Sequence, residues 1–243
     1  MTALGILYPG HFAEDDYARI EQLLGSDIRV DLVRVEGAED AHRVDAPREM
    51  GSPERLAASV EGLRLAGAET VVWAAPSGGF GYGWEGAQEQ VRALAVAAGM
   101  LASSTSFAFV HAVRELGVRR VAVGAPYAQD SADLFADFLR AGGVEVAGVR
   151  AAGAGTPEEI AGWGEAETLA LARAADASGA EAVVLPDIAL HTAAHVPLLE
   201  ESLGKPVLTA NQVTVWEGLR LADRRVNAPE LGALFTREPI VQV

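Results

Sequence analysis

Short apolar runs alternate with helical patterns along nearly the whole chain. Seven runs predict strands, at residues 3–8, 28–35, 70–74, 120–124, 144–149, 182–185 and 206–208. Helical spacing of apolar residues between them predicts helices over residues 14–24, 53–66, 85–98, 105–116, 129–141, 164–178, 196–203 and 212–222. Such alternation is typical of βαβ units. We therefore expect an α/β fold whose parallel sheets are covered by helices on both faces.

The pattern also repeats once within the chain. Gly67–Trp73 reads GAETVVW and Gly179–Leu185 reads GAEAVVL, and residues 100–106 likewise resemble residues 206–212. A proline followed by an acidic helix start occurs at Pro9 and again at Pro126. Any two βα units look somewhat alike, but three matches in one order favour a duplication. We predict two pseudosymmetric Rossmann-like lobes, one made of residues 1–102 plus 210–243 and the other of residues 103–209.

Composition narrows the possible functions. The 243 residues include no cysteine, which excludes disulfides, thiolate metal sites and a thiol nucleophile. The net charge of −15 argues against nucleic acid and against an anionic membrane surface as partners. The N-terminal MTALGILYPG is typical of a buried strand and not of a signal peptide, and no apolar run is long enough to span a membrane. We expect a cytoplasmic protein.

The duplicated architecture predicts where a ligand binds. In open parallel sheets ligands lie beyond the carboxyl ends of the strands, and the helix N-termini there favour anions. Two facing lobes therefore predict a cleft for a small carboxylate between them. The loops that would form it are 9–11, 75–80, 103–106, 126–128, 187–192 and 209–212.

The stretch 75–83, APSGGFGYG, is the most distinctive of these loops. Its four glycines allow the backbone to approach a ligand closely, and Ser77 adds a hydroxyl. It lacks both the Walker pattern and the dinucleotide fingerprint. We expect Ala75, Ser77 and Gly78 to contact substrate, the alternative being a flexible connector.

Polar side chains at other strand ends suggest the chemistry. Tyr127 can donate to a carboxylate or enolate oxygen, or it makes only a structural hydrogen bond. Asp187 follows a buried strand, where a carboxylate is costly unless it is solvated, caps a turn or is functional. His11 and His191 are further candidate proton carriers. His191 and His195 are four residues apart but have no evident third ligand, so we expect no metal.

The residues at two helix starts have two interpretations. Ser103–Thr105 begin one helix, and Thr209 with Asn211 begin its counterpart. Each is an ordinary N-cap choice. As a symmetric pair they also suit the two carboxylates of a diacid.

Together these segments resemble the Asp/Glu racemase superfamily, especially its maleate cis–trans isomerase and arylmalonate decarboxylase branch. The resemblance rests on motifs spread over nearly the whole chain, namely Gly5–Pro9, Ala74–Phe80, Ala125–Tyr127, Leu185–Thr192, Leu203–Gln212 and Trp216–Arg220. It implies two lobes, no cofactor, a homodimer or higher homo-oligomer, and proton transfer next to a carboxylate. Hydroxyls and backbone amides would hold that carboxylate, with Pro9, His11, Ile188 and Asn211 among the contacts.

The chain departs from this family at the cysteines. Isomerases and racemases of the group use one cysteine from each lobe, and by the motifs Ala75 and Asp187 stand in their places. A one-residue gap would put Ile188 at the second position. A two-cysteine racemisation or a cysteine adduct is therefore excluded.

We expect a cofactor-independent isomerase, lyase, hydratase or decarboxylase acting on a small carboxylic acid, with Asp187, Tyr127 and His191 as catalytic residues. An ionised Asp is a ready base but a poor acid; burial would raise the pKa of Asp187, a following helix start would lower it, and His191 could supply the missing acid. The aspartate therefore favours proton abstraction or water activation over carbanion protonation. The alternative function is an inactive carboxylate-binding relative.

Overall fold

A computed structural model of the chain describes residues 1–10, 12–25, 27–35, 49 and 51–236. The strands in that part are β1 (Thr2–Tyr8), β2 (Ile28–Arg34), β3 (Thr70–Trp73), β4 (Leu101–Ser104), β5 (Arg120–Ala125), β6 (Glu145–Ala151), β7 (Ala182–Leu185) and β8 (Val207–Thr209). The α-helices are α1 (Glu14–Leu24), α3 (Pro53–Ala66), α4 (Ser77–Phe80), α5 (Gly83–Ala98), α6 (Thr105–Leu116), α7 (Gln129–Ala141), α8 (Pro157–Ala161), α9 (Glu165–Ala175), α10 (Val196–Leu203) and α11 (Ala210–Leu221).

The strands form two parallel sheets of four strands each. The first has the order β2-β1-β3-β4 and the second the order β6-β5-β7-β8, so the two sheets have the same topology. The repeated segments 67–73 and 179–185 each contain the third strand of a sheet, β3 and β7, as the internal duplication predicts. The α/β class and the pair of parallel sheets expected from the sequence are confirmed.

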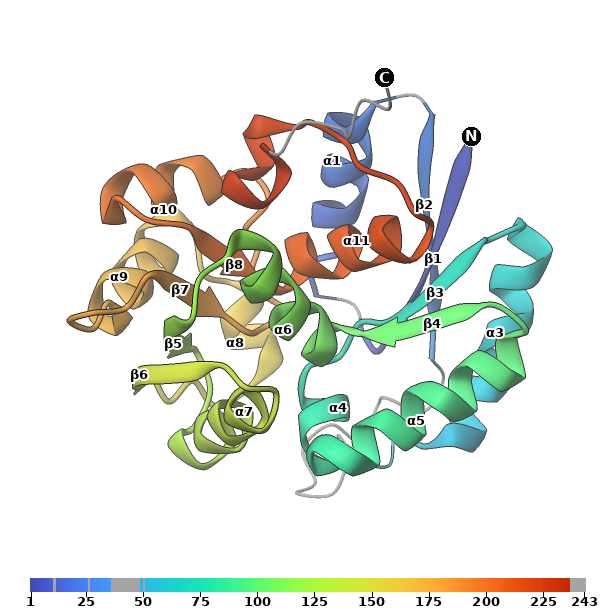
Figure 1. Cartoon of the computed structure of the whole chain (residues 1–243), viewed down its shortest axis with the longest axis horizontal. Helices are drawn as coiled ribbons and strands as arrows, with labels where there is room; N and C mark the ends of the chain where they lie inside the picture. The colour runs from blue at the N-terminus through green and yellow to red at the C-terminus, as the bar shows by residue number, and fades with distance from the viewer. Residues whose placement is uncertain (11, 26, 36–48, 50, 237–243) are drawn as a thin grey trace.

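Two helices join the sheets. Helix α6 follows the last strand of the first sheet and α11 follows the last strand of the second, and these two helices pack against each other between the sheets (Figure 1). Helix α11 also packs on β3 and β4 of the first sheet. A core of Val, Leu, Ile and Phe side chains runs through both sheets and the helices between them. The lobe boundaries at residues 102 and 210 stay a prediction.

Short elements differ from the expected pattern. Strand β4 was not expected, because its residues LASS are half polar and lie at a sheet edge. The glycine-rich stretch is not simply an open connector, since Ser77–Phe80 form the helical turn α4. Helix α8 was missed as well, although Thr156 caps it by accepting the Glu159 N–H at 3.2 Å.

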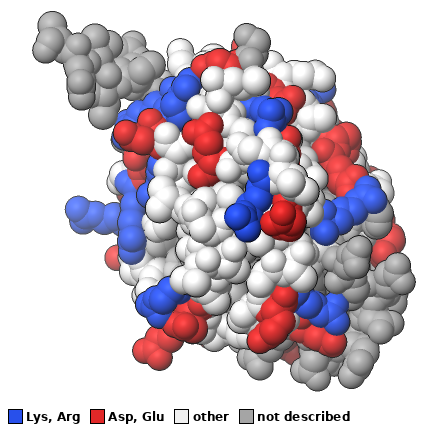
Figure 2. Space-filling view, turned by 90° about the vertical axis from the view of Figure 1, so that its right-hand side faces the viewer, with Lys and Arg blue, Asp and Glu red and all other residues white. Residues whose placement is uncertain are grey.

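The surface carries both acidic and basic side chains. Acidic and basic side chains are interspersed on the face shown in Figure 2. Several recorded surface charges form ion pairs, including Arg34 with Glu14 and Arg140 with Asp137. Within the ranges that the structure covers, no helix is long and apolar enough to cross a membrane. The cytoplasmic location and the homo-oligomer stay predictions.

Candidate active site

A cavity of about 230 Å³ lies where the loops after β1, β3, β5 and β7 meet. Most of its wall is apolar. The lining consists of Pro9, Phe12, Ala75, Pro76, Ser77, Phe80, Tyr127, Ser131, Ala154, Gly155, Thr156, Pro157, Ile160, Pro186, Asp187, Ile188 and Ala189. The cavity thus lies at the carboxyl ends of strands from both sheets, where parallel sheets place their ligands.

Asp187 is the carboxylate of this cavity. It comes two residues after β7, and its Oδ1 accepts the Ala189 N–H at 2.7 Å. Burial raises the pKa of Asp187 to about 6, although the Ala189 hydrogen bond acts in the opposite direction. The α-helix that follows β7 begins only at Val196, so it does not offset the burial, as a helix start directly after Asp187 would. A carboxyl group with this pKa can both donate and accept a proton near neutral pH.

Tyr127 lies beside Asp187 as a neutral donor. It follows β5, and its hydroxyl donates to the Pro186 carbonyl over a long 3.5 Å. Burial and then the charge of Asp187 raise the pKa of Tyr127 well above its ordinary value. The phenol therefore stays protonated, and its weak bond to Pro186 leaves it able to donate to a ligand oxygen.

Ser77 enters the cavity from the other lobe as the first residue of α4. Helix α6 holds the start of this helical turn, because the Ser106 hydroxyl donates to the Pro76 carbonyl at 2.9 Å. A Cβ on Gly79 would lie 2.6 Å from the Ser106 Oγ, so glycine is needed for this close approach to α6. The N–H of a first helical residue has no partner within the helix. Ser77 thus brings a hydroxyl and an amide donor.

The sequence pairs Ala75 with Asp187, and the structure brings both to this one cavity. Pro9, Ser77, Tyr127 and Ile188 also line it, as the sequence predicts. His11 lies outside the described residues.

Three other expected contacts lie elsewhere. Gly78 is buried behind the lining, where its carbonyl accepts from Gln90 Nε2 at 2.7 Å. His191 does not line the cavity, and its Nδ1 is 3.1 Å from an Asp15 carboxylate oxygen. Asn211 is fully buried, and its Nδ2 donates to the Ile188 and Leu190 carbonyls.

The symmetric helix starts do not face a ligand. Thr105 Oγ1 is 2.5 Å from Thr214 Oγ1, so this hydroxyl joins α6 to α11. Thr209 accepts from the Thr192 hydroxyl at 2.9 Å. Neither helix start contributes to the lining. The expectation that these side chains hold two carboxylates is wrong, because the packing of α6 against α11 turns them into the protein interior.

Several lining residues were not predicted from the sequence. Phe12, Ser131, Thr156, Pro157 and Ile160 line the cavity. The last three belong to α8 and its cap, whose Thr-Pro-Glu-Glu start is a helix signal that could have located this wall.

Comparison with known proteins agrees with this geometry. A sequence profile described as arylmalonate decarboxylase matches residues 51–235. The chain belongs to the arylmalonate decarboxylase family. An arylmalonate decarboxylase of Bordetella bronchiseptica is 32% identical over 146 residues, which are 59% of this chain and 61% of that protein. A maleate isomerase of Geobacillus stearothermophilus is 25% identical over 134 residues, 55% of this chain and 53% of that protein.

A crystal structure of arylmalonate decarboxylase superposes with a TM-score of 0.77 at 26% identity, covering 97% of this chain and all of the other. The curated relatives are matched over only about half to three fifths of their length. The resemblance to this branch inferred from the sequence motifs is confirmed. This member of the arylmalonate decarboxylase family has no cysteine at all, and Asp187 lines its cavity.

Proposed function

We propose that the protein is a cofactor-independent enzyme that transfers a proton at the carbon next to the carboxylate of a small carboxylic acid. Asp187 would be the proton carrier, with Ser77 and Tyr127 binding the carboxylate. The single observation that carries this proposal is the Asp187 carboxyl, with a pKa of about 6, in the wall of the cavity beside Tyr127.

Neutral donors suit such a reaction. No Lys, Arg or His is among the lining residues of the described chain, so the Ser77 hydroxyl and N–H and the Tyr127 phenol would hold the substrate carboxylate. When a bond to the neighbouring carbon breaks, its electron pair spreads onto that carboxylate. Donors positioned to bind these oxygens would stabilise the developing charge in this largely apolar cavity.

A single proton carrier is compatible with three reaction types. In an isomerisation Asp187 would take a proton from one carbon and return it to another. In an elimination it would take a proton while a hydroxide or other group leaves with the electron pair. In a decarboxylation the C–C bond would break, CO₂ would leave, and Asp187 would protonate the carbon and recover its proton from solvent.

The raised pKa of Asp187 bears on the preference for proton abstraction. That preference took ionised Asp187 to be a poor acid, so that His191 would have to supply any acid. Burial instead raises the Asp187 pKa to about 6, and His191 lies outside the cavity lining. Asp187 can therefore protonate a carbanion itself, and decarboxylation stands level with isomerisation and elimination.

One observation favours the alternative, a binding protein without catalysis. The hydrogen bond from the Ala189 N–H to Asp187 Oδ1 is a turn-capping contact that Asp makes in many loops. If Asp187 did nothing else, the cavity would bind a carboxylate without transforming it.

Incorporation of solvent deuterium, followed together with conversion of the acid, tests the proposal for all three reaction types. The protein would be incubated in D₂O with a panel of substituted malonates, unsaturated diacids and hydroxy acids, and both the carbon-bound hydrogens and the conversion of each acid followed by NMR. We expect conversion of at least one acid or deuterium next to its carboxylate, and neither with heat-denatured protein. Acids that bind without any incorporation or conversion would support the binding protein instead.

A further inference from the structure

A second buried carboxylate, Asp16, takes no part in the proposed proton transfer. It lies in the first turn of α1 and is 4% exposed. Its Oδ2 accepts the Thr192 N–H at 2.8 Å, and both of its oxygens lie 3.2 Å from the Ala193 nitrogen. Helix α1 of the first lobe therefore holds the end of the segment that carries Asp187.

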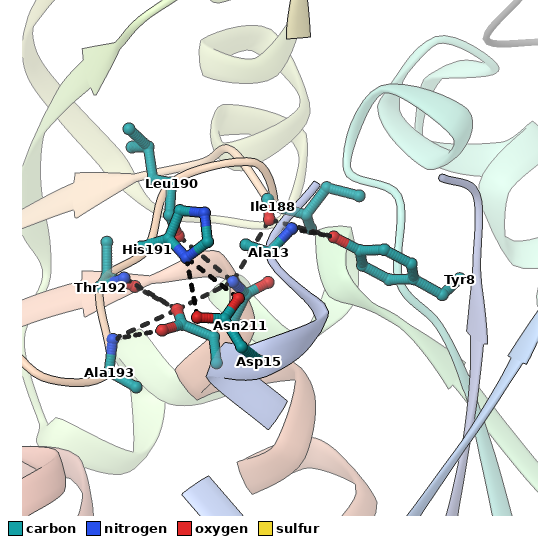
Figure 3. A network of polar contacts seen from close by, with 10 residues as sticks. Tyr8, Ala13, Asp15, Ile188, Leu190, His191, Thr192, Ala193 and Asn211 are labelled. Atoms are coloured by element: carbon teal, nitrogen blue, oxygen red, sulfur yellow. Dashed lines mark hydrogen bonds and ion pairs between the residues drawn. The ribbon is translucent and has the colours of Figure 1, made fainter. Parts of the chain in front are cut away.

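Two further side chains hold the same segment. Asn211 Nδ2 donates to the Ile188 and Leu190 carbonyls, each at 3.3 Å, and to Asp16 Oδ2 at 3.0 Å. The Tyr8 hydroxyl donates to the Ile188 carbonyl at 3.4 Å and accepts the Ala13 N–H at 3.1 Å (Figure 3). We call Tyr8, Asp16 and Asn211 the clamp.

The clamp joins parts of the chain that are far apart in sequence. Tyr8 is on β1, Asp16 on α1 and Asn211 on α11, which packs on the first sheet. The segment they hold follows β7 of the second sheet. Burying an Asp16 carboxylate is costly, and burial raises its pKa, so its hydrogen bonds must offset that cost. Those bonds are to the Thr192 and Ala193 amides and to Asn211, which contacts the Asp187 segment.

We propose that Asp16 is a positioning residue for Asp187, because the clamp fixes residues 187–193 so that the Asp187 carboxylate faces the cavity and is shielded from bulk water. A role of Asp16 in catalysis rests on the proposed function, because it requires Asp187 to be the proton carrier. The geometry itself, a segment held by three side chains that do not line the cavity, does not depend on it.

The titration of Asp187 can report whether the clamp is closed, because the ionisable groups around it are known. Tyr8 and Tyr127 are close enough for the charge of Asp187 to raise their pKa values, and both stay neutral. Glu14 and Asp16 are the other carboxylates that act on Tyr8, and His191 on the same segment pairs with Asp15. If the clamp opens, water reaches Asp187 and its pKa falls towards the ordinary value of about 3.9.

The test is a carboxyl ¹³C NMR titration of the full chain without substrate, with the Asp187 signal assigned by its loss in Asp187→Asn. In the wild type we expect a midpoint near 6. The side chain of Asp16→Asn is neutral and has one acceptor oxygen for the Thr192 and Ala193 amides, so it should hold the segment less tightly. In this variant we expect the midpoint of the Asp187 titration to fall by about one pH unit or more. Asp130→Asn is the control, because it removes the same charge at an exposed position on α7.

The inference is overturned if Asp187 titrates at the same pH in the wild type and in Asp16→Asn, even if the variant is less stable. If Asp16→Asn does not fold, Asn211→Ser frees the Ile188 and Leu190 carbonyls while keeping the Asp16 contacts to the amides, and it should shift the midpoint in the same direction. An unchanged midpoint in that variant also overturns the inference. Because no substrate is present, failure here would leave the deuterium experiment unaffected.

Discussion

At the scale of single residues, the same side-chain type plays three different parts. Asp187 faces the cavity, Asp16 is buried behind it, and Asp15 pairs with His191 at the surface. The sequence points to Asp187, because a carboxylate directly after a buried strand is unusual. It does not distinguish Asp16 from Asp15, since both look like ordinary acidic residues of a helix start. Only the packing of α1 against a distant segment buries one of them.

The raised pKa of Asp187 has a consequence for stability. A carboxyl whose folded pKa is above its unfolded value contributes stability that is present below about pH 4 and is lost as the pH rises through about 6. Asp187→Asn removes the ionisation and keeps an oxygen for the Ala189 N–H. We expect this variant to be more stable than the wild type at pH 8 by about 1–2 kcal/mol, and to gain much less at pH 4.

Urea unfolding at the two pH values measures this difference. Asp130→Asn, at an exposed position on α7, is the control and should show no comparable gain. A gain for Asp187→Asn that is the same at pH 4 and pH 8 would contradict a raised pKa.

At the scale of elements, the long periodic segments were predictable and the short ones were not. The repeat correctly indicated two equivalent sheets, because the segments that contain β3 and β7, GAETVVW and GAEAVVL, share five of seven residues. Strand β4 and the helices α4 and α8 have only four or five residues of ambiguous pattern, so only tertiary contacts define them. Helix α4 matters most for the site, because it positions Ser77.

Gln90 on α5 holds this turn in place. Its buried Nε2 donates to the Gly78 carbonyl at 2.7 Å and to the Gly51 carbonyl at 2.5 Å. Gln90→Met keeps the size of the side chain but leaves both carbonyls without this donor. We expect a loss of about 1–3 kcal/mol in the free energy of unfolding.

The exposed Gln88→Met on the same helix is the matched control and should change stability by less than about 0.5 kcal/mol. Equal effects of the two substitutions, measured by urea unfolding, would show that Gln90 does not secure α4.

At the scale of the whole molecule, the packing of α6 against α11 joins the two sheets. Glu217 on α11 is fully buried and pairs with His111 on α6 at 2.9 Å and with Arg220 at 2.7 Å. Burial alone would raise the pKa of Glu217, but the bonds from Arg220 and His111 outweigh it and lower the pKa to about 2. The Glu217 carboxylate, which contacts His111 on α6 and Arg220 on α11, therefore contributes stability that depends on pH.

A lowered carboxyl pKa stabilises the fold above the unfolded value of about 4.3, and this contribution is lost as the pH falls through about 2. We expect Glu217→Gln to lose about 3 kcal/mol at pH 7, because Arg220 and His111 lose their buried partner. The deficit should shrink between pH 5 and pH 2 in acid unfolding.

Glu115→Gln is the control, since Glu115 on α6 makes a more exposed pair with Arg225 at 3.5 Å. Its effect should stay within about 1 kcal/mol. If Glu217→Gln were no worse than Glu115→Gln at pH 7, the buried pair would not be what joins the two helices.

The most direct test of the central claim is the turnover rate of Asp187→Asn on whichever acid the deuterium panel identifies, measured beside the wild type and Asp130→Asn. General acid–base catalysis contributes about 10²–10⁴-fold. We predict that the rate of deuterium transfer falls by roughly this factor in Asp187→Asn, with the KM little changed, and that Asp130→Asn matches the wild type. A rate for Asp187→Asn within about twofold of the wild type would contradict the assignment of Asp187 as the proton carrier.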